Sequence, residues 1–348
     1  MKKIVILTLF VTVFFVTYAL VKNMKLFTSI AILHSLFSGG GNDSIKSIVI
    51  NKSLCVDVIG VCRANDKLSC NYVFDKQIYA FRCDTLPQIK FWRQIMNLHK
   101  DSALLSLSHN RTVVEKTHHS VWSAKNDISK RFYRDSVRCA YVLDSSCRVL
   151  LTDGKQFFYD FNRAFDSFDR GINDFIANGV DPWYAQAILL IESPNKLQKS
   201  NAGAYGSFQL MKEVARLFGL KVNRQIDERA DFDRSAFAAS SLIKTICIPN
   251  TKLILDSLHV EYNESELWFK LLVMHSYHAG SGNVKKALYT FMPQKGDMNL
   301  IYNLWHAQTR HFRSASQNYS QLVLAAMLEM NTRVSLVSEF GTSTVKNN

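Results

Sequence analysis

The sequence predicts a mainly α-helical protein in which a helical domain follows a small α+β region and an N-terminal hydrophobic segment. Three observations lead to this fold class. Apolar residues recur at helical spacing in the second half of the chain, beginning in residues 157–175. Short runs typical of strands are confined to residues 46–160, and residues 4–21 carry no charge. The 348 residues are enough to bury two cores.

The first 25 residues are expected to be a signal anchor or a signal peptide. A short positive flank precedes residues 4–21, an uncharged stretch of 18 residues that exceeds the core of a usual cleaved signal and is borderline for spanning a bilayer. No cysteine occurs before Cys55, which excludes a lipoprotein anchor. We therefore favour an anchor over a cleaved signal, and we interpret residues 26–45, which include three consecutive glycines, as a linker.

Residues 46–160 contain no motif that assigns a role, and we expect an α+β accessory region. The runs typical of strands are residues 48–50, 58–61, 79–81 and 149–151, and the helical runs are residues 88–99 and 127–140. Six of the seven cysteines precede the helical domain, and these are Cys55, Cys62, Cys70, Cys83, Cys139 and Cys147. In an oxidising compartment they permit up to three disulfides of undetermined connectivity, and free buried thiols are the alternative for some of them. The lack of a Cys-x-x-Cys pair argues against zinc.

The helical domain begins with residues 157–175, where the phenylalanine spacing indicates a core helix more than a carbohydrate platform. Asn178-Gly179 ends this helix, because both residues tolerate the left-handed conformation. Asp181-Pro182 begins the next helix with an N-cap side chain and a ring already set for the first turn. That helix, residues 183–191, is apolar and is stopped by Pro194.

Glu192 therefore lies in the last turn of an apolar helix. Unpaired backbone carbonyls make the local field negative there, and the neighbours offer little water, so both effects disfavour the ionised carboxylate. A carboxyl that stays protonated near neutral pH can act as a general acid. A lone glutamate at a helix end is more often an ordinary exposed residue, so this hypothesis depends on two further segments.

The first of these segments is the glycine-rich run at residues 203–211. Gly203 and Gly206 permit unusual backbone dihedrals and the close approach of a ligand. Gln209 offers both a donor and acceptors for hydrogen bonds, which suits an N-acetyl sugar. A helix over residues 207–218 is expected here.

The second segment is the end of a helix predicted over residues 264–277. Asn263 is its expected N-cap, supported by Glu266 three residues later in the pattern of a capping box. Tyr277 lies at the helix terminus, facing a loop, where its hydroxyl could donate a hydrogen bond to Glu192 or to a sugar.

Together the three segments resemble the family 1 lytic transglycosylases, whose catalytic domain of the soluble lytic transglycosylase type is related in fold to goose-type lysozyme. Family members carry Glu-Ser, then Gly-Leu-Met-Gln, then Ala-Tyr-Asn. The corresponding runs here are Glu192-Ser193, Gly206-Ser207-Phe208-Gln209 and Ser276-Tyr277-His278. The resemblance spans roughly residues 165–335 and includes Tyr319, similar to a tyrosine near the end of the family domain. It implies a lysozyme-like domain at residues 161–335 and a polar tail at 336–348, and we expect the chain to fray after Met330.

The resemblance also implies roles for individual residues. Glu192 would be the catalytic residue. The implied substrate-binding residues are Ser193, Gly206, Phe208, Gln209, Tyr277 and His278. Phe208 stands where the family has a methionine that packs against a sugar acetamido group, and aromatic stacking could replace that contact. His278 stands in place of an asparagine and presents a different hydrogen-bond pattern.

By the same resemblance, the protein is expected to cleave the β-1,4 bond between N-acetylmuramic acid and N-acetylglucosamine in peptidoglycan, with intramolecular attack that gives 1,6-anhydromuramic ends. One carboxylate is sufficient for that reaction, whereas an ordinary glycosidase needs two. The possible second carboxylates are Asp227, Glu228, Asp231 and Asp233. Their pattern reads better as the start of a helix at residues 236–246, with Asp231 or Asp233 as the cap. A hydrolytic lysozyme-type muramidase and a non-catalytic peptidoglycan-binding module remain the alternatives.

The net charge of +13 suits a polyanionic partner, and peptidoglycan stems and neighbouring envelope polymers carry carboxylates and phosphates. We expect no nucleic-acid partner, because the basic residues are dispersed and no recognition motif is present. We expect no cofactor and no metal, because no acidic residue completes a metal-binding box between His275 and His278. The expected location is the cell envelope, in the periplasm, either anchored in the inner membrane through residues 4–21 or secreted.

Overall fold

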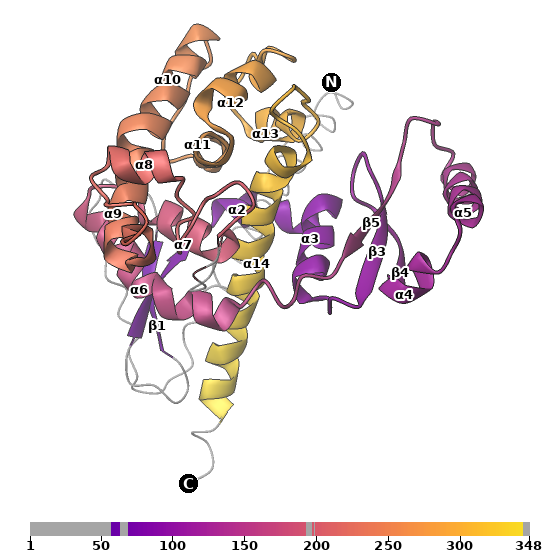
Figure 1. Cartoon of the computed structure of the whole chain (residues 1–348), viewed down its shortest axis with the longest axis horizontal. Helices are drawn as coiled ribbons and strands as arrows, with labels where there is room; N and C mark the ends of the chain where they lie inside the picture. Colours follow the sequence, from indigo (N-terminus) through magenta and orange to yellow (C-terminus); the bar gives the residue numbers. More distant parts are fainter. Residues whose placement is uncertain (1–56, 63–68, 193–196, 198, 344–348) are drawn as a thin grey trace, which may run out of the picture. The chain divides into compact units, whose positions relative to one another are not determined.

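The computed structural model describes residues 57–62, 69–192, 197 and 199–343, and Figure 1 shows these as ribbons. Within them the chain is mainly helical, and the strands precede the long run of helices, as the sequence predicts. The predicted N-terminal segment, the linker and the strand at residues 48–50 lie outside the described residues. Among the helices of the described part, none combines the length and apolar character needed to cross a membrane.

The strands form two small antiparallel sheets. One is the hairpin of β1 (Asp57–Cys62) and β2 (Ser69–Phe74), and in the other β3 (Ser102–Leu107) lies between β4 (Val113–His118) and β5 (Val149–Asp153). The strands predicted at residues 58–61 and 149–151 are confirmed. The strand predicted at residues 79–81 is wrong, because residues of that run belong to the helical turn α2 (Gln77–Ala80). Strands β2, β3 and β4 were not among the predicted elements.

Four further helical segments lie in this first part of the chain. They are η1 (Cys83–Thr85), α3 (Pro87–Asn97), α4 (His119–Ser123) and α5 (Asp127–Ala140). The helices predicted at residues 88–99 and 127–140 correspond to α3 and α5. Proline occupies the first turn of α3, where its missing N–H costs no hydrogen bond. The side chain of Asn126 caps α5 by accepting a hydrogen bond from the N–H of Ser129 at 2.8 Å.

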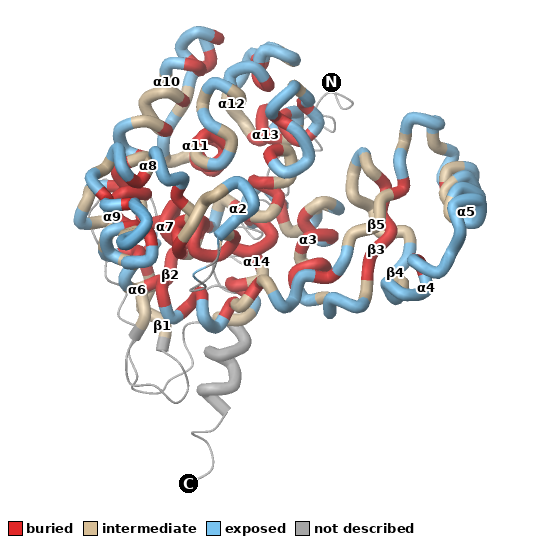
Figure 2. Tube along the Cα trace, in the orientation of Figure 1, coloured by how far each residue is buried: buried red, intermediate tan, exposed pale blue. Residues whose placement is uncertain are grey.

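The helical domain starts with α6 (Phe161–Ala177) and α7 (Pro182–Ile191), and their ends follow the predicted signals. Gly179 has a φ of +67°, in the left-handed region, just after α6 ends. The carboxylate of Asp181 accepts a hydrogen bond from the N–H of Trp183 at 2.9 Å and so caps α7. Every residue of α7 is buried, which Figure 2 shows as a continuous red segment. A helix with apolar residues on nearly every side belongs in the core.

The remaining elements are α8 (Lys212–Leu217), η2 (Glu228–Ala230), α9 (Phe232–Leu242), η3 (Ile243–Cys247), α10 (Ile248–Ser257), α11 (Leu267–Ala279), α12 (Ser281–Leu288), α13 (Met298–Leu304) and α14 (Ser314–Ser343). The segment η3 is a π-helical turn between α9 and α10. Pro249, in the first turn of α10, lacks the N–H that would continue the regular ladder. Helix α14 lies against α3, α7 and α11.

Most of the apolar core is continuous. It joins residues of the β1–β2 hairpin and α3 to residues of α6, α7, α11 and α14. A second, smaller core consists of Leu105, Leu107, Trp122, Val137 and Val149, from the three-stranded sheet and the helices packed on it. The predicted accessory region is therefore divided between two cores, one of which it shares with the helical domain.

The C-terminal segment differs from the expectation. Helix α14 continues to Ser343, so the prediction that the chain frays after Met330 is wrong up to that residue, and residues 344–348 lie outside the described part.

The cysteines also limit the predicted disulfides. Cys83, Cys139, Cys147 and Cys247 have free thiols, whereas Cys55 lies outside the described residues.

Candidate active site

Glu192 caps the C-terminal end of α7. Its N–H donates a hydrogen bond to the carbonyl of Ile188 at 2.9 Å, so the residue closes the last turn of the helix as predicted. The residue is partly exposed, although the helix before it is fully buried. Burial raises the pKa of the Glu192 carboxyl from 4.5 to about 6. A large fraction of these carboxyls is therefore protonated near pH 6.

Tyr319, on α14, is a direct partner of this carboxyl. Its hydroxyl donates a hydrogen bond to Oε1 of Glu192 at 2.6 Å. A donor of this kind favours the ionised carboxylate and lowers its pKa, but the effect is smaller than that of burial. Burial and the nearby carboxylate raise the pKa of Tyr319 itself, so the phenol keeps its proton and acts as the donor. The family resemblance pointed to Tyr319 but gave it no role.

His278 lies directly on Tyr319. The two rings are nearly parallel, with an interplanar angle of 21° and 4.2 Å between their centroids. His278 is exposed overall, but desolvation of the ring lowers the pKa of the imidazole. A neutral imidazole therefore supports the phenol that binds Glu192. The structure thus places His278 against the tyrosine that binds the predicted catalytic residue.

Tyr277 also lies near Glu192, but its hydroxyl does not form the hydrogen bond to Glu192 that was one of its two predicted roles. It donates a hydrogen bond to the backbone carbonyl of Phe208 at 2.6 Å, and not to Glu192. Burial and then the Glu192 carboxylate raise the pKa of Tyr277, which places the two side chains in the same neighbourhood. Tyr277 therefore ties the end of α11 to the glycine-rich loop, and Tyr319 provides the hydrogen bond that was considered for Tyr277.

Phe208 does not have the position that sugar stacking requires. Its side chain is fully buried, with 0% of its surface exposed. The ring stacks on Phe175 at 5.8 Å and meets Phe232 edge-on at 5.3 Å. The expectation that this ring replaces the family methionine against an acetamido group is therefore corrected. Phe208 anchors the loop in the core, and its contribution to the site is the carbonyl that accepts from Tyr277.

Gly206 and Gln209 shape the loop between these anchors. Gly206 has a φ of +84°, and a Cβ at this position would lie 2.0 Å from the carbonyl oxygen of Arg229. Gln209 is a non-glycine residue with a φ of +45°, and its side-chain amide donates to the carbonyl of Gly206 at 3.0 Å. Both residues thus have a local structural function. The predicted helix at residues 207–218 begins only at Lys212, because these turns precede it.

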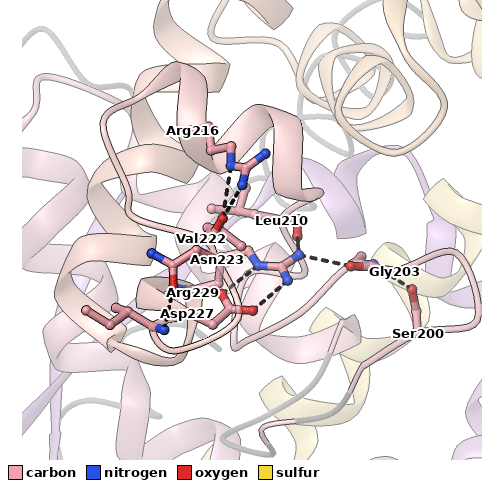
Figure 3. A network of polar contacts seen from close by, with 10 residues as sticks. Ser200, Gly203, Leu210, Arg216, Val222, Asn223, Asp227 and Arg229 are labelled. Atoms are coloured by element: carbon pink, nitrogen blue, oxygen red, sulfur yellow. Dashed lines mark hydrogen bonds and ion pairs between the residues drawn. The ribbon is translucent and has the colours of Figure 1, made fainter.

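Arg229 organises this loop, and the sequence analysis did not identify it. Only 2% of its surface is exposed, and Figure 3 shows it at the centre of the polar network. Its guanidinium binds both oxygens of Asp227, at 2.8 and 2.7 Å, and donates to the carbonyls of Gly203 and Leu210, each at 2.9 Å. One buried side chain therefore holds both ends of the turn that contains Gly206. The glycine spacing was the only signal of this arrangement in the sequence.

The four other candidate carboxylates each have a structural partner. Asp227 binds Arg229 as described, and Glu228 forms an ion pair with Arg234 at 3.0 Å. Asp231 accepts from the N–H of Arg234 at 3.0 Å and caps α9, which confirms one of the two predicted caps. Helix α9 begins at Phe232, four residues earlier than predicted. The remaining acid, Asp233, forms an exposed ion pair with Arg170 at 2.7 Å.

The site therefore brings together Glu192, Tyr319, His278, Tyr277 and the loop anchored by Phe208. Ser193, the other predicted residue of the first motif, lies outside the described residues. Its assignment as a substrate-binding residue, and the binding roles of Gly206, Gln209, Tyr277 and His278, stay predictions.

Comparison with known families identifies this part of the chain. Residues 176–298 match the family model described as the transglycosylase SLT domain. The chain therefore carries a transglycosylase SLT domain, a catalytic domain of the lytic transglycosylase type with a lysozyme-like fold. No curated protein matches the chain. The matched range contains α7 to α12 and all three sequence motifs, whereas Tyr319 and the strands lie beyond it.

The domain supports a general role in cleaving the glycan strands of peptidoglycan, and it implies peptidoglycan as the substrate that the protein binds. An acid that is partly protonated near pH 6, on a partly exposed residue at a helix end, is compatible with that chemistry.

Proposed function

We propose that the protein is a peptidoglycan lytic transglycosylase that cleaves the β-1,4 bond between N-acetylmuramic acid and N-acetylglucosamine and leaves 1,6-anhydromuramic ends. The observation that carries this proposal is the Glu192 carboxyl. It has a pKa of about 6, is partly exposed at the end of a buried helix, and has one oxygen held by Tyr319 at 2.6 Å. Such a group can give up a proton and later take one back.

In the first step, protonated Glu192 donates its proton to the glycosidic oxygen as the bond to the anomeric carbon breaks. The Tyr319 hydroxyl already occupies Oε1, so we assign the transferred proton to Oε2. The same hydrogen bond stabilises the carboxylate that remains after the transfer. The hydroxyl on C6 of the muramic acid then attacks the anomeric carbon, and the Glu192 carboxylate accepts its proton. The acid is thereby restored without a second carboxylate.

The occupied acidic residues favour this route over hydrolysis. A hydrolytic glycosidase needs a second carboxyl about 5–5.5 Å or about 6.5–9.5 Å from the acid, depending on its stereochemistry. The four candidates in the sequence are each bound to an arginine or used as a helix cap. They would have to leave these partners to act as a nucleophile or base.

We further propose that the protein acts in the periplasm, anchored in the inner membrane or secreted. The support is the uncharged stretch at residues 4–21 with its flanking lysines. The net charge of +13 would attract the chain to the polyanionic cell envelope.

The test is a digest of purified sacculi, with the released fragments weighed by mass spectrometry. Anhydro ends are lighter by one water than reducing ends, so the two reactions are distinguished by mass. We expect anhydro ends from the wild-type chain. Reducing ends would instead identify a hydrolytic muramidase, and binding without release would identify a non-catalytic module.

A further inference from the structure

We propose that the segment at residues 71–93, which precedes the SLT domain, is a brace that positions the active site. Its main positioning residues are Gln77, within the segment, and Gln186, which binds the segment from α7. The segment makes side-chain hydrogen bonds to each of the three helices that carry Glu192, Tyr277 and Tyr319. The inference rests on the proposed function where enzyme activity is measured. A second measurement, hydrogen exchange, tests it independently of activity.

The contact with α7 is made by Gln186, which is fully buried. Its side-chain amide pairs with the backbone of Val73 in β2. The N–H of Val73 donates to Oε1 and Nε2 donates to the carbonyl of Val73, both at 2.8 Å. This paired arrangement fixes the position of α7 along β2 as well as its rotation. Gln186 lies six residues before Glu192, which caps the same short helix. Fixing Gln186 against β2 therefore also fixes where the Glu192 carboxyl lies.

The contact with α11 is made by Gln77. Helix α11 has no side-chain cap from its own N-cap residue, Glu266. The side chain of Gln77 supplies one instead, because its Oε1 accepts from the N–H of Leu267 at 2.9 Å and its Nε2 donates to the carbonyl of Ser265 at 2.9 Å. The other end of the same helix carries Tyr277. Holding the first turn therefore helps to fix where that tyrosine meets the loop.

The contact with α14 is made by aromatic side chains. The indole N–H of Trp92 donates to the side chain of Gln321 at 3.0 Å, only two residues after Tyr319. Further along the helix, the hydroxyl of Tyr72 hydrogen-bonds to the side chain of Asn331. Trp92, Gln321, Tyr72 and Asn331 are all buried. Buried polar groups of this kind are costly to leave unpaired, so the helix and the brace hold one another in register.

These contacts matter because the central hydrogen bond of the site joins two helices. Glu192 and Tyr319 are 127 positions apart in the sequence, and their 2.6 Å contact depends on how α7 lies against α14. The brace binds α7 at Gln186, six residues before Glu192, and α14 at Gln321, two residues after Tyr319. It lies outside residues 176–298, so the functional unit is larger than the matched domain.

The test uses Gln186→Leu and Gln77→Ala in the full-length chain, with soluble uncrosslinked glycan strands as substrate. We expect kcat to fall by about tenfold to a hundredfold with little change in KM, because the reacting groups are displaced while the binding surface remains. Gln77→Glu should recover only part of the loss, since a carboxylate still accepts from the N–H of Leu267 but cannot donate to the carbonyl of Ser265. The matched control is Ser240→Ala, which removes a buried hydrogen bond to Asn178 outside the brace and should leave kcat unchanged.

Hydrogen exchange measured by mass spectrometry provides the second readout. In Gln186→Leu, the amides of α7 and of the first turns of α14 should exchange faster, whereas Ser240→Ala should affect only α9 and its neighbours. If the wild-type chain released nothing from sacculi, the proposed function would fail and the exchange result would still test the brace. If Gln186→Leu did not fold, Gln77→Ala, a change at a partly exposed position, would still test the contact between the brace and α11. Unchanged kcat and unchanged exchange in the site helices of folded variants would overturn the proposal.

Discussion

The end of α7 and the loop at residues 203–211 are both motif segments of the SLT domain, yet they use their polar groups in opposite ways. At the end of α7, the Glu192 carboxyl accepts a hydrogen bond from Tyr319, and the residue is partly exposed. In the loop, the carbonyls of Gly203 and Leu210 are bound by buried Arg229. The first segment keeps a reactive group available, and the second forms a support held by Arg229 and joined to α11 through Tyr277. The motifs of one family can therefore include both reactive residues and residues that only support the fold.

The largest expected effect concerns the reactive segment. Replacing Glu192→Gln keeps the shape of the side chain but removes the acid. We expect turnover of peptidoglycan to fall by about two to four orders of magnitude, because proton donation to the glycosidic oxygen is lost. Release of fragments from sacculi measures the effect. A variant that retained wild-type turnover would remove Glu192 from the mechanism.

The next effect concerns the supporting segment. Arg229→Ala removes a buried cation and leaves Asp227 and two loop carbonyls without their partner, so we expect a loss of about 3–5 kcal/mol in the free energy of unfolding. Denaturant titration measures it. Arg170→Ala is the matched control, because its ion pair with Asp233 is exposed and should contribute less than about 1 kcal/mol. Equal losses in the two variants would show that the buried arginine has no special structural function.

A smaller effect concerns the pH dependence of catalysis, which distinguishes a hydroxyl bound to the acid from a hydroxyl bound to the loop. The hydrogen bond from Tyr319 lowers the pKa of Glu192, so Tyr319→Phe should raise that pKa and keep the acid protonated to higher pH. The alkaline limb of the kcat/KM profile should therefore move to higher pH. Tyr277→Phe is the control, because its hydroxyl binds the loop carbonyl of Phe208 and not the acid. A limb that moved in the control, or stayed in Tyr319→Phe, would contradict this assignment.

The smallest effect is on stability. Because the folded state raises the pKa of Glu192 from 4.5 to about 6, the folded protein binds a proton more tightly than the unfolded chain. The associated stability is fully present below pH 4.5 and is lost as the pH rises through about 6. Glu192→Gln does not titrate, so above pH 6 it should gain about 1–2 kcal/mol relative to the wild type. Unfolding free energies that differ equally at all pH values would argue against the shift.

Local signals in the sequence predicted the reactive segment well. Asp181, Pro182 and Gly179 determine where α6 and α7 end and begin, and these signals act within a few residues. The position of Glu192 follows directly from them. The helix α5 was predicted with its full range for the same reason, because its cap, Asn126, is local.

Interactions between distant residues explain most of the differences. Asn263 was predicted to cap α11, but its side chain accepts from the N–H and hydroxyl of Ser265 in a turn before the helix. The first N–H of α11 is bound by Gln77, which is 190 residues away. Likewise, nothing near Phe208 in the sequence shows that its ring is enclosed by residues of α6 and α9. A single sequence contains the local preferences but does not show which distant partners satisfy them.

The most direct test of the account is a titration of the Glu192 carboxyl by carbon NMR, with the signal assigned by its loss in Glu192→Gln. The account predicts a midpoint near pH 6 in the wild-type protein, because burial outweighs the hydrogen bond from Tyr319. A midpoint at or below the ordinary value of 4.5 would mean that the carboxyl is well hydrated and ionised, and it would contradict a role as general acid.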